Sequence, residues 1–273
     1  MEPFTVIGLT TIIGRLLPEP HAGLLAGILF GTKATLAADL KTALITSGTI
    51  HMIALSGQNI SILVTVMTSF LVILFSRRTA SLLIMGMLVG YVAFVGVSPS
   101  VVRAAVMGSI SLFAVIIGRA SWSILTWILA VSSMILLHPL WIADVGFQLS
   151  AFASLGIILF GKARYRYESK PNWHTLLLRA IDSDLRITLA AQSLTIPLIL
   201  LYFHRVSLVA PLSNLAIGWT MPLLMIAGWL AAIMGWIFLP LGQVFAWVCW
   251  MMLEWIVRVV LFVDTIPFAS IGW

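Results

Sequence analysis

The sequence predicts an all-α integral membrane protein, a polytopic helical bundle with broken or re-entrant helices and amphipathic segments at its N-terminus. Of the 273 residues, 61% are hydrophobic and only 9% are charged. A soluble domain carries about 25% charged residues, so most of the surface of this chain must face lipid. We therefore interpret residues 1–273 as a single transmembrane domain.

Residues 1–48 are expected to lie at the membrane interface or to enter the membrane without crossing it. Two apolar runs, 4–17 and 22–31, are separated by Pro18 and Pro20. Crossing the hydrocarbon takes about 20 helical residues, and each run is shorter than that. We therefore expect an interfacial or re-entrant pair of helices here.

Residues 49–273 are expected to form the bundle, with about eight crossings of the bilayer. The apolar stretches that could cross occupy 50–75, 80–97, 101–118, 122–138, 144–161, 187–203 and 241–264. A further stretch, 208–238, contains Pro211 and Pro222. Because proline removes a backbone donor and disrupts the preceding turn, we interpret 208–238 as one broken crossing. Pro197 is expected to break the helix of 187–203 in the same way.

The distribution of basic residues predicts the orientation of the bundle. If the stretches cross alternately, one face collects the basic loops, which contain Arg77 and Arg78, then Arg119, then the long polar connection 162–186. The other face holds the turns at 97–100 and 138–143, which contain no Lys or Arg, and also Arg205. Since Lys and Arg collect on cytoplasmic loops, the first face is predicted to be cytoplasmic, and 162–186 is predicted to be a basic cytoplasmic loop.

Polar residues inside apolar stretches supply the candidate functional residues. An ionisable side chain at the bilayer centre costs about 2.5–3.5 kcal/mol on insertion scales. The presence of such residues in a span therefore requires a pairing partner or a function. Three clusters, at 51–59, 98–103 and 144–150, share the outer half of the predicted bundle, as a common polar vestibule requires. The candidates are His51, Ser56, Gly57, Asn59, Arg103, Asp144 and Gln148, with Gln192 and Asn214 from later stretches.

A purely structural interpretation of these residues stays open. Arg103 and Asp144 have opposite charges and could neutralise one another. Asn59 and Gln148 could provide hydrogen bonds between helices, which is a common use of amides in membrane bundles. His51 alone is more typical of an interfacial histidine than of a ligand.

No motif for catalysis or cofactor binding is present in the sequence. It contains no G-x-x-x-x-G-K-[ST] loop, no H-E-x-x-H and no G-x-S-x-G. The spacing of His, Cys and Asp suggests no metal site. We therefore expect no catalytic residue, no cofactor and no metal. Two alternatives stay open: a secondary transporter of a small anionic solute, and an intramembrane hydrolase that uses His51, Ser56 and Asp144.

The polar clusters resemble the motifs of the ComEC-type competence domain. Residues 48–60 resemble its tG-x-x-H-x-x-a-i-S-G-x-x-v signature, residues 99–104 its pS-x-x-R-A element, and residues 139–150 its P-x-x-x-x-D-x-G-F-Q-L-S element. The family's closing pattern follows in order from Gln192 to Pro222. The similarity runs from about residue 15 to residue 225. Departures occur at His138, where the family usually has an acidic residue, and at 58–59.

The resemblance implies a multi-pass channel component of the bacterial inner membrane that passes single-stranded DNA into the cytoplasm during natural transformation. The residues of this sequence that match motif positions of the family are His51, Ser56, Gly57, Arg103, Asp144, Gly146, Phe147, Gln148, Gln192, Pro197 and Asn214. Larger family members also carry an OB-like and a metallo-β-lactamase-like domain, for which this sequence shows no H-x-H-x-D-H motif.

The same resemblance implies a set of partners. Besides single-stranded DNA and membrane lipid, we expect a cytoplasmic ATP-driven motor or single-strand-binding protein, because the chain has no P-loop of its own. We also expect an extracytoplasmic DNA receptor and a separate nuclease. Assembly as a homo-oligomer is compatible with the sequence.

Overall fold

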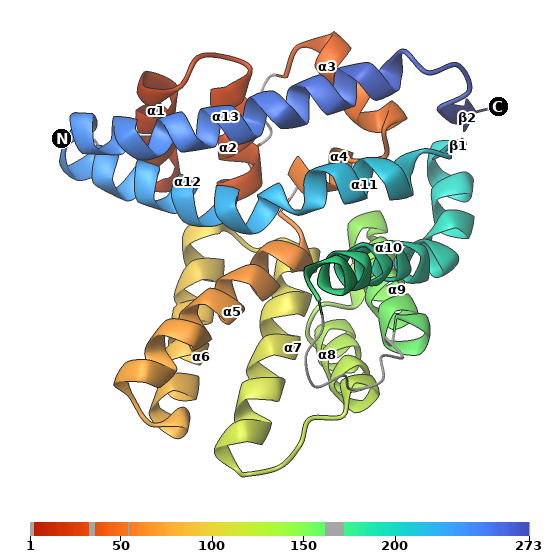
Figure 1. The fold of residues 1–273 in the computed structure, drawn as a ribbon. Helices are drawn as coiled ribbons and strands as arrows, with labels where there is room; N and C mark the ends of the chain where they lie inside the picture. The colour runs from red at the N-terminus through yellow and green to blue at the C-terminus, as the bar shows by residue number, and fades with distance from the viewer. Residues whose placement is uncertain (1–2, 33–35, 54, 162–171, 273) are drawn as a thin grey trace.

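The structure is a computed structural model that describes residues 3–32, 36–53, 55–161 and 172–272 (Figure 1). These residues form thirteen α-helices, one short 3-10 helix and a sheet of two three-residue strands. The predicted all-α class is therefore confirmed.

The N-terminal quarter contains four short helices, and the central part contains the first long ones. The short helices are α1 (Val6–Leu16), α2 (His21–Phe30), α3 (Ala38–Thr46) and α4 (Ile50–Ile53). The central helices are α5 (Gly57–Leu74), α6 (Arg77–Val95), α7 (Pro99–Ile116), α8 (Ser123–Leu137) and α9 (Val145–Phe160), with the 3-10 helix η1 (Pro139–Ala143) before α9.

The C-terminal part contains α10 (Trp173–Phe203), α11 (Ala210–Gly218), α12 (Thr220–Ile237) and α13 (Leu239–Asp264). Strand β1 (Arg205–Ser207) follows α10 and pairs antiparallel with β2 (Ser270–Gly272). This pairing fixes the residues that follow α13 against the turn between α10 and α11. The side chain of Arg205 strengthens the junction, because its Nε donates to Ser270 Oγ at 2.9 Å.

Two apolar cores organise two groups of the described helices, while α8, α9 and α10 contribute to neither core. The first core is built mainly from α1, α2, α3, α12 and α13, and the second from α5, α6 and α7. Trp229 of α12 packs against both cores and contacts Phe30, Tyr91 and Phe94 through its ring. In Figure 1, α12 and α13 run across the molecule while α5, α6 and α7 run downward from them. Because the two groups run across one another, the number of crossings does not follow from the number of helices alone.

The end of α2 joins the two groups. This helix ends at Gly31, whose φ of 66° is the left-handed conformation that glycine adopts most easily. Its last-turn carbonyls accept hydrogen bonds from the second group: Ile28 from Asn59 Nδ2 at 2.9 Å, and Leu29 from the Tyr91 hydroxyl at 3.2 Å. With 11 and 10 residues, α1 and α2 are the short apolar helices that the sequence predicted.

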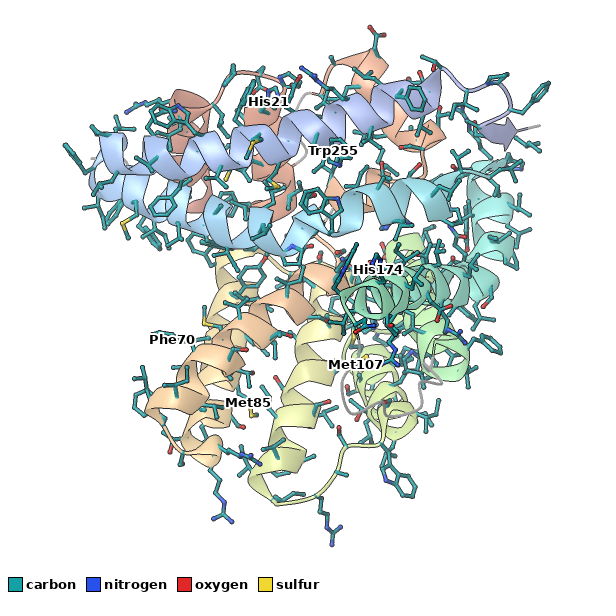
Figure 2. All side chains as sticks on the ribbon, viewed as in Figure 1. His21, Phe70, Met85, Met107, His174 and Trp255 are labelled. Carbon is teal, nitrogen blue, oxygen red and sulfur yellow. The ribbon has the colours of Figure 1, made fainter. Side chains whose placement is uncertain are left out.

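The described helices present many large apolar side chains on their outer surfaces. Phe70 on α5 is 62% exposed and points away from the bundle (Figure 2), and Ile73 one turn on is 81% exposed. Six helices, α5, α6, α7, α10, α12 and α13, are long and apolar enough to cross a membrane. Exposed apolar surface of this extent belongs in lipid, so the chain is a membrane protein.

Several predicted boundaries are corrected by the structure. The stretch 50–75 is divided, because residues 55 and 56 are not helical and separate α4 from α5. The stretches 122–138 and 144–161 form α8 and α9, which have 15 and 16 residues and are shorter than a full span. Of the predicted loop 162–186, residues 162–171 lie outside the described residues, and α10 already begins at Trp173. The pair Asp182 and Arg186 lies at helical i,i+4 spacing, which supports this early start.

The three prolines predicted to break helices do not do so in this structure. Helix α10 continues through Pro197. Pro211 and Pro222 lie in the first turns of α11 and α12, where the missing N–H would have no intrahelical partner in any case. The break that the sequence predicted within 208–238 exists, but it lies at Trp219, between the two helices.

Candidate functional site

Arg103 is the centre of the candidate site. It lies on α7, one turn after the proline that begins this helix, and only 6% of its surface is exposed. Its Nε donates to Ser150 Oγ on α9 at 2.8 Å, and its Nη1 lies 3.2 Å from Met107 Sδ. Met107, labelled in Figure 2, lies on the side of α7 that faces α8 and α9. The cluster at 98–103 thus meets the cluster at 144–150.

The cluster at 51–59 reaches the same place from α5. A β-carbon added at Gly57 would lie 2.8 Å from Arg103 Nη2, so the guanidinium occupies space that only a glycine leaves open. Ser100 Oγ, one turn before Arg103, donates to the carbonyl of Leu55 at 3.0 Å. This bond fixes the non-helical segment between α4 and α5 against α7. The structure therefore brings residues of all three polar clusters together.

No acidic residue of the described ranges balances the charge of Arg103. Within the described ranges, no Asp or Glu side chain forms an ion pair with it. Asp144 instead caps α9, because its Oδ1 accepts the backbone N–H of Phe147 at 2.7 Å. The interpretation in which Arg103 and Asp144 neutralise one another is therefore wrong for this structure. A buried cation without a carboxylate partner is costly, and the side chains that contact the Arg103 guanidinium, Ser150 and Met107, are both neutral.

Ser56 and Asn59 fix the start of α5. Ser56 Oγ donates to Asn59 Oδ1 at 3.2 Å, and Asn59 Nδ2 donates to the carbonyl of Ile28 at 2.9 Å. Asn59 is 2% exposed, so both polar atoms of its side chain are engaged inside the protein. Asn59 shapes the site by joining α5 to the end of α2.

Gln148 connects α9 to its neighbours in the chain and in space. Its Nε2 donates to the carbonyl of Ile142 in η1 at 2.8 Å, and its Oε1 accepts the Tyr202 hydroxyl of α10 at 2.9 Å. Gln148 thus sets the position of α9 relative to α10. Helix α9 also supplies Ser150. Gln192 lies on α10 and is half-buried.

His51 and Asn214 lie near a second junction, where the turn before α4 meets the start of α11. His51 Nδ1 lies 3.0 Å from the carbonyl of Gly48. Gly48 has a φ of 71°, and a β-carbon there would lie 2.5 Å from Ala210 Cβ, so a larger residue would separate the turn before α4 from α11. Asn214 Oδ1 on α11 is buried and has no hydrogen-bond donor among the described residues.

The geometry does not support hydrolysis by the three residues considered for it. Ser56 Oγ contacts Asn59, His51 Nδ1 contacts Gly48, and Asp144 Oδ1 contacts Phe147, so none of the three is hydrogen-bonded to another. A serine nucleophile needs its base within hydrogen-bond reach. In the part of the chain that the structure describes, no group of three or more His, Cys, Asp or Glu side chains could hold a metal ion.

Sequence reasoning missed the residues that complete the site. Ser150 lies inside a predicted cluster. Its bond to Arg103 can be recognised only when the structure places α9 beside α7. Ser100 and Tyr202 likewise act only through contacts 45 and 54 residues away along the chain.

The fold and the site define a helical, multi-pass membrane protein with a buried cationic centre. The chain belongs to the Competence protein family, whose family model matches residues 28–273, and the resemblance seen in its motifs is thereby confirmed. It is 26% identical over 201 residues to ComE operon protein 3 of Bacillus subtilis (strain 168), covering 73% of this chain and 25% of that protein.

A second relative is the uncharacterized protein YcaI of Escherichia coli (strain K12), 24% identical over 224 residues, which covers 76% of this chain and 28% of the relative. The chain therefore spans about a quarter of the length of these curated relatives. No solved structure matches this chain.

Proposed function

We propose that this chain forms the conduit through which single-stranded DNA crosses the bacterial inner membrane during natural transformation. The observation that carries the proposal is Arg103, a buried cation with no carboxylate partner among the described residues, at the junction of three polar segments. Membership of the Competence protein family supports a role in DNA uptake.

The chemistry of DNA explains why such a site is needed. A single strand carries one negative charge per nucleotide, and an unpaired charge is strongly disfavoured in an apolar environment. Hydroxyl, amide and guanidinium groups are the donors that bind phosphate oxygens in nucleic-acid complexes. Arg103 and the Ser150 hydroxyl, whose oxygen accepts from Arg103 Nε, provide such donors within one small region. The hydroxyls of Ser56 and Ser100 lie nearby but donate to Asn59 and to the Leu55 carbonyl.

We place the path beside Gly57 and Arg103, where α5, α7 and α9 meet. Asn59, Asp144 and Gln148 shape it by fixing the ends of these helices. His51, Gln192 and Asn214 are proposed as further contacts along the path.

The orientation of the path follows from the basic residues. Arg77 and Arg78 begin α6, and Arg119 follows α7, so they lie at the helix ends opposite to Ser98. The positive-inside rule assigns these ends to the cytoplasm. DNA would then enter from a receptor near Ser98 and emerge toward a cytoplasmic motor or single-strand-binding protein, with strand degradation assigned to a separate nuclease.

The test is uptake of labelled DNA in cells that lack this gene. We expect deletion to abolish nuclease-protected uptake, and the complementing gene to restore it, with membrane levels matched by immunoblot. Uptake that persists after deletion, in a host without a second copy, would contradict the proposal. Restored uptake of a small radiolabelled organic anion, without DNA, would favour the secondary transporter instead.

A further inference from the structure

The N-terminus of α5 has free backbone donors directly beside Arg103. The first N–H groups of a helix have no intrahelical partner. Ser56 stands at the capping position, but its side chain makes no capping bond and donates to Asn59 instead. Among the described residues, the N–H groups of Gly57 and Gln58 donate to no acceptor. With respect to the described residues, this 18-residue helix therefore presents two uncapped amides at its positive end.

Arg103 points a free donor at the same place. Its Nε and Nη1 contact Ser150 and Met107, while Nη2 has no acceptor in the described chain and faces Gly57. A guanidinium carries five N–H donors, so the two contacts leave most of them unused. Only 6% of the residue is exposed, so little of its surface is open to water.

Gly57 decides how closely the Arg103 guanidinium approaches the start of α5. The position has no left-handed backbone, so alanine would fit its conformation without strain. The added β-carbon would nevertheless lie 2.8 Å from Nη2 and would push the guanidinium away from the helix end. The absence of a side chain therefore keeps the guanidinium and the amides adjacent.

We propose that Arg103 Nη2 and the backbone amides of Gly57 and Gln58 form a binding site for the phosphodiester oxyanion. A helix N-terminus and a guanidinium are both established anion donors, and together they favour a tetrahedral oxyanion. The inference rests on the proposed function, which identifies the phosphodiester as that of a DNA strand. Because none of these donors reads a base edge, the site is indifferent to sequence and to the presence of bases.

Fluorescence anisotropy of the full chain, purified in maltoside micelles without phospholipid, tests the site. The probe is a labelled oligothymidylate, and the competitors are an abasic strand of the same length and short-chain phosphatidylglycerol. The variants are Gly57→Ala, Arg103→Gln and Arg103→Lys. The matched control is Gly90→Ala on α6, where an added β-carbon meets no atom within 4 Å. Thermal unfolding identifies variants that fold.

We expect Gly57→Ala and Arg103→Gln to weaken binding by about tenfold or more, the effect of losing a charge-assisted hydrogen bond. Gly90→Ala should bind like the wild type, Arg103→Lys should bind with intermediate affinity, and the abasic strand should compete as well as the oligothymidylate. If a folded Gly57→Ala protein bound the strand with wild-type affinity, the proposed oxyanion site would be contradicted, but the proposed conduit function would not. Competition by phosphatidylglycerol but not by the abasic strand would overturn it in favour of a lipid headgroup. A wild-type protein that binds no strand would instead contradict the proposed function.

Discussion

Arg103 Nε and Ser150 Oγ are joined by a 2.8 Å hydrogen bond across 47 residues of sequence. This bond links α7 to α9 and fixes the plane of the guanidinium, so that Nη2 faces Gly57 at the start of α5. One side-chain contact therefore holds together groups from three segments that lie far apart in the chain.

Removal of the Ser150 hydroxyl should loosen this arrangement without removing the charge. We expect Ser150→Ala to raise the dissociation constant for a phosphodiester strand by about two- to tenfold, because the hydroxyl orients the guanidinium while the charge of Arg103 remains. Ser150→Thr keeps the hydroxyl and should restore the affinity. The affinity is measured by fluorescence anisotropy. If it were equally low in Ser150→Ala and Ser150→Thr, Ser150 would have a packing role and would not orient the guanidinium.

Asn59 should affect stability more than binding. Its amide joins the start of α5 to the end of α2 while it is buried, and loss of such a bond leaves the Ile28 carbonyl without that donor. We expect Asn59→Ala to lower the free energy of unfolding by about 1–3 kcal/mol, measured by denaturant titration in micelles. The exposed neighbour Gln58 is the matched control, and an equal loss in Gln58→Ala would contradict this role.

Asp144 should act as a helix cap and not as the counterion of Arg103. Asparagine caps helices as well as aspartate does, whereas alanine costs about 1 kcal/mol. We therefore expect Asp144→Asn to keep both stability and strand binding, and Asp144→Ala to lose stability alone. If Asp144→Asn increased strand affinity by tenfold, the carboxylate would be opposing the anion after all.

Cysteine labelling should confirm the orientation of the bundle. The native Cys249 is buried, and its replacement by serine gives a background without thiols. Val97 is 68% exposed between α6 and α7, and Arg78 is exposed at the other end of α6. A membrane-impermeant maleimide added to intact cells should label Val97→Cys and not Arg78→Cys. The reverse pattern would invert the proposed direction of transport.

Composition and motif spacing predict the fold class and the main helices of this protein, but they do not place its helix breaks correctly. The 61% hydrophobic content predicts an integral membrane protein. The limits of α6 and α7 follow the predicted apolar stretches closely. The convergence of the clusters that contain Gly57, Arg103 and Ser150 was also predicted, because alternating crossings place them at one depth.

The errors have definite physical causes. The sequence predicts breaks at Pro211 and Pro222, but proline also fits the first turn of a helix, and its presence alone does not distinguish the two cases. The polar start of α10 was interpreted as a loop, although residues such as Asp182 and Arg186 support one another at helical spacing. The pairing of Arg103 with Ser150, and not with Asp144, depends on which face of α9 meets α7, and local sequence carries no signal for that choice.

The most direct test of the central claim is nuclease-protected uptake of labelled DNA in cells whose own gene is deleted and replaced by wild type, Arg103→Gln or Gly90→Ala, at equal membrane levels. The account predicts that wild type and Gly90→Ala restore uptake and that Arg103→Gln does not. Full restoration by Arg103→Gln would show that DNA does not depend on this cation, and it would contradict the account.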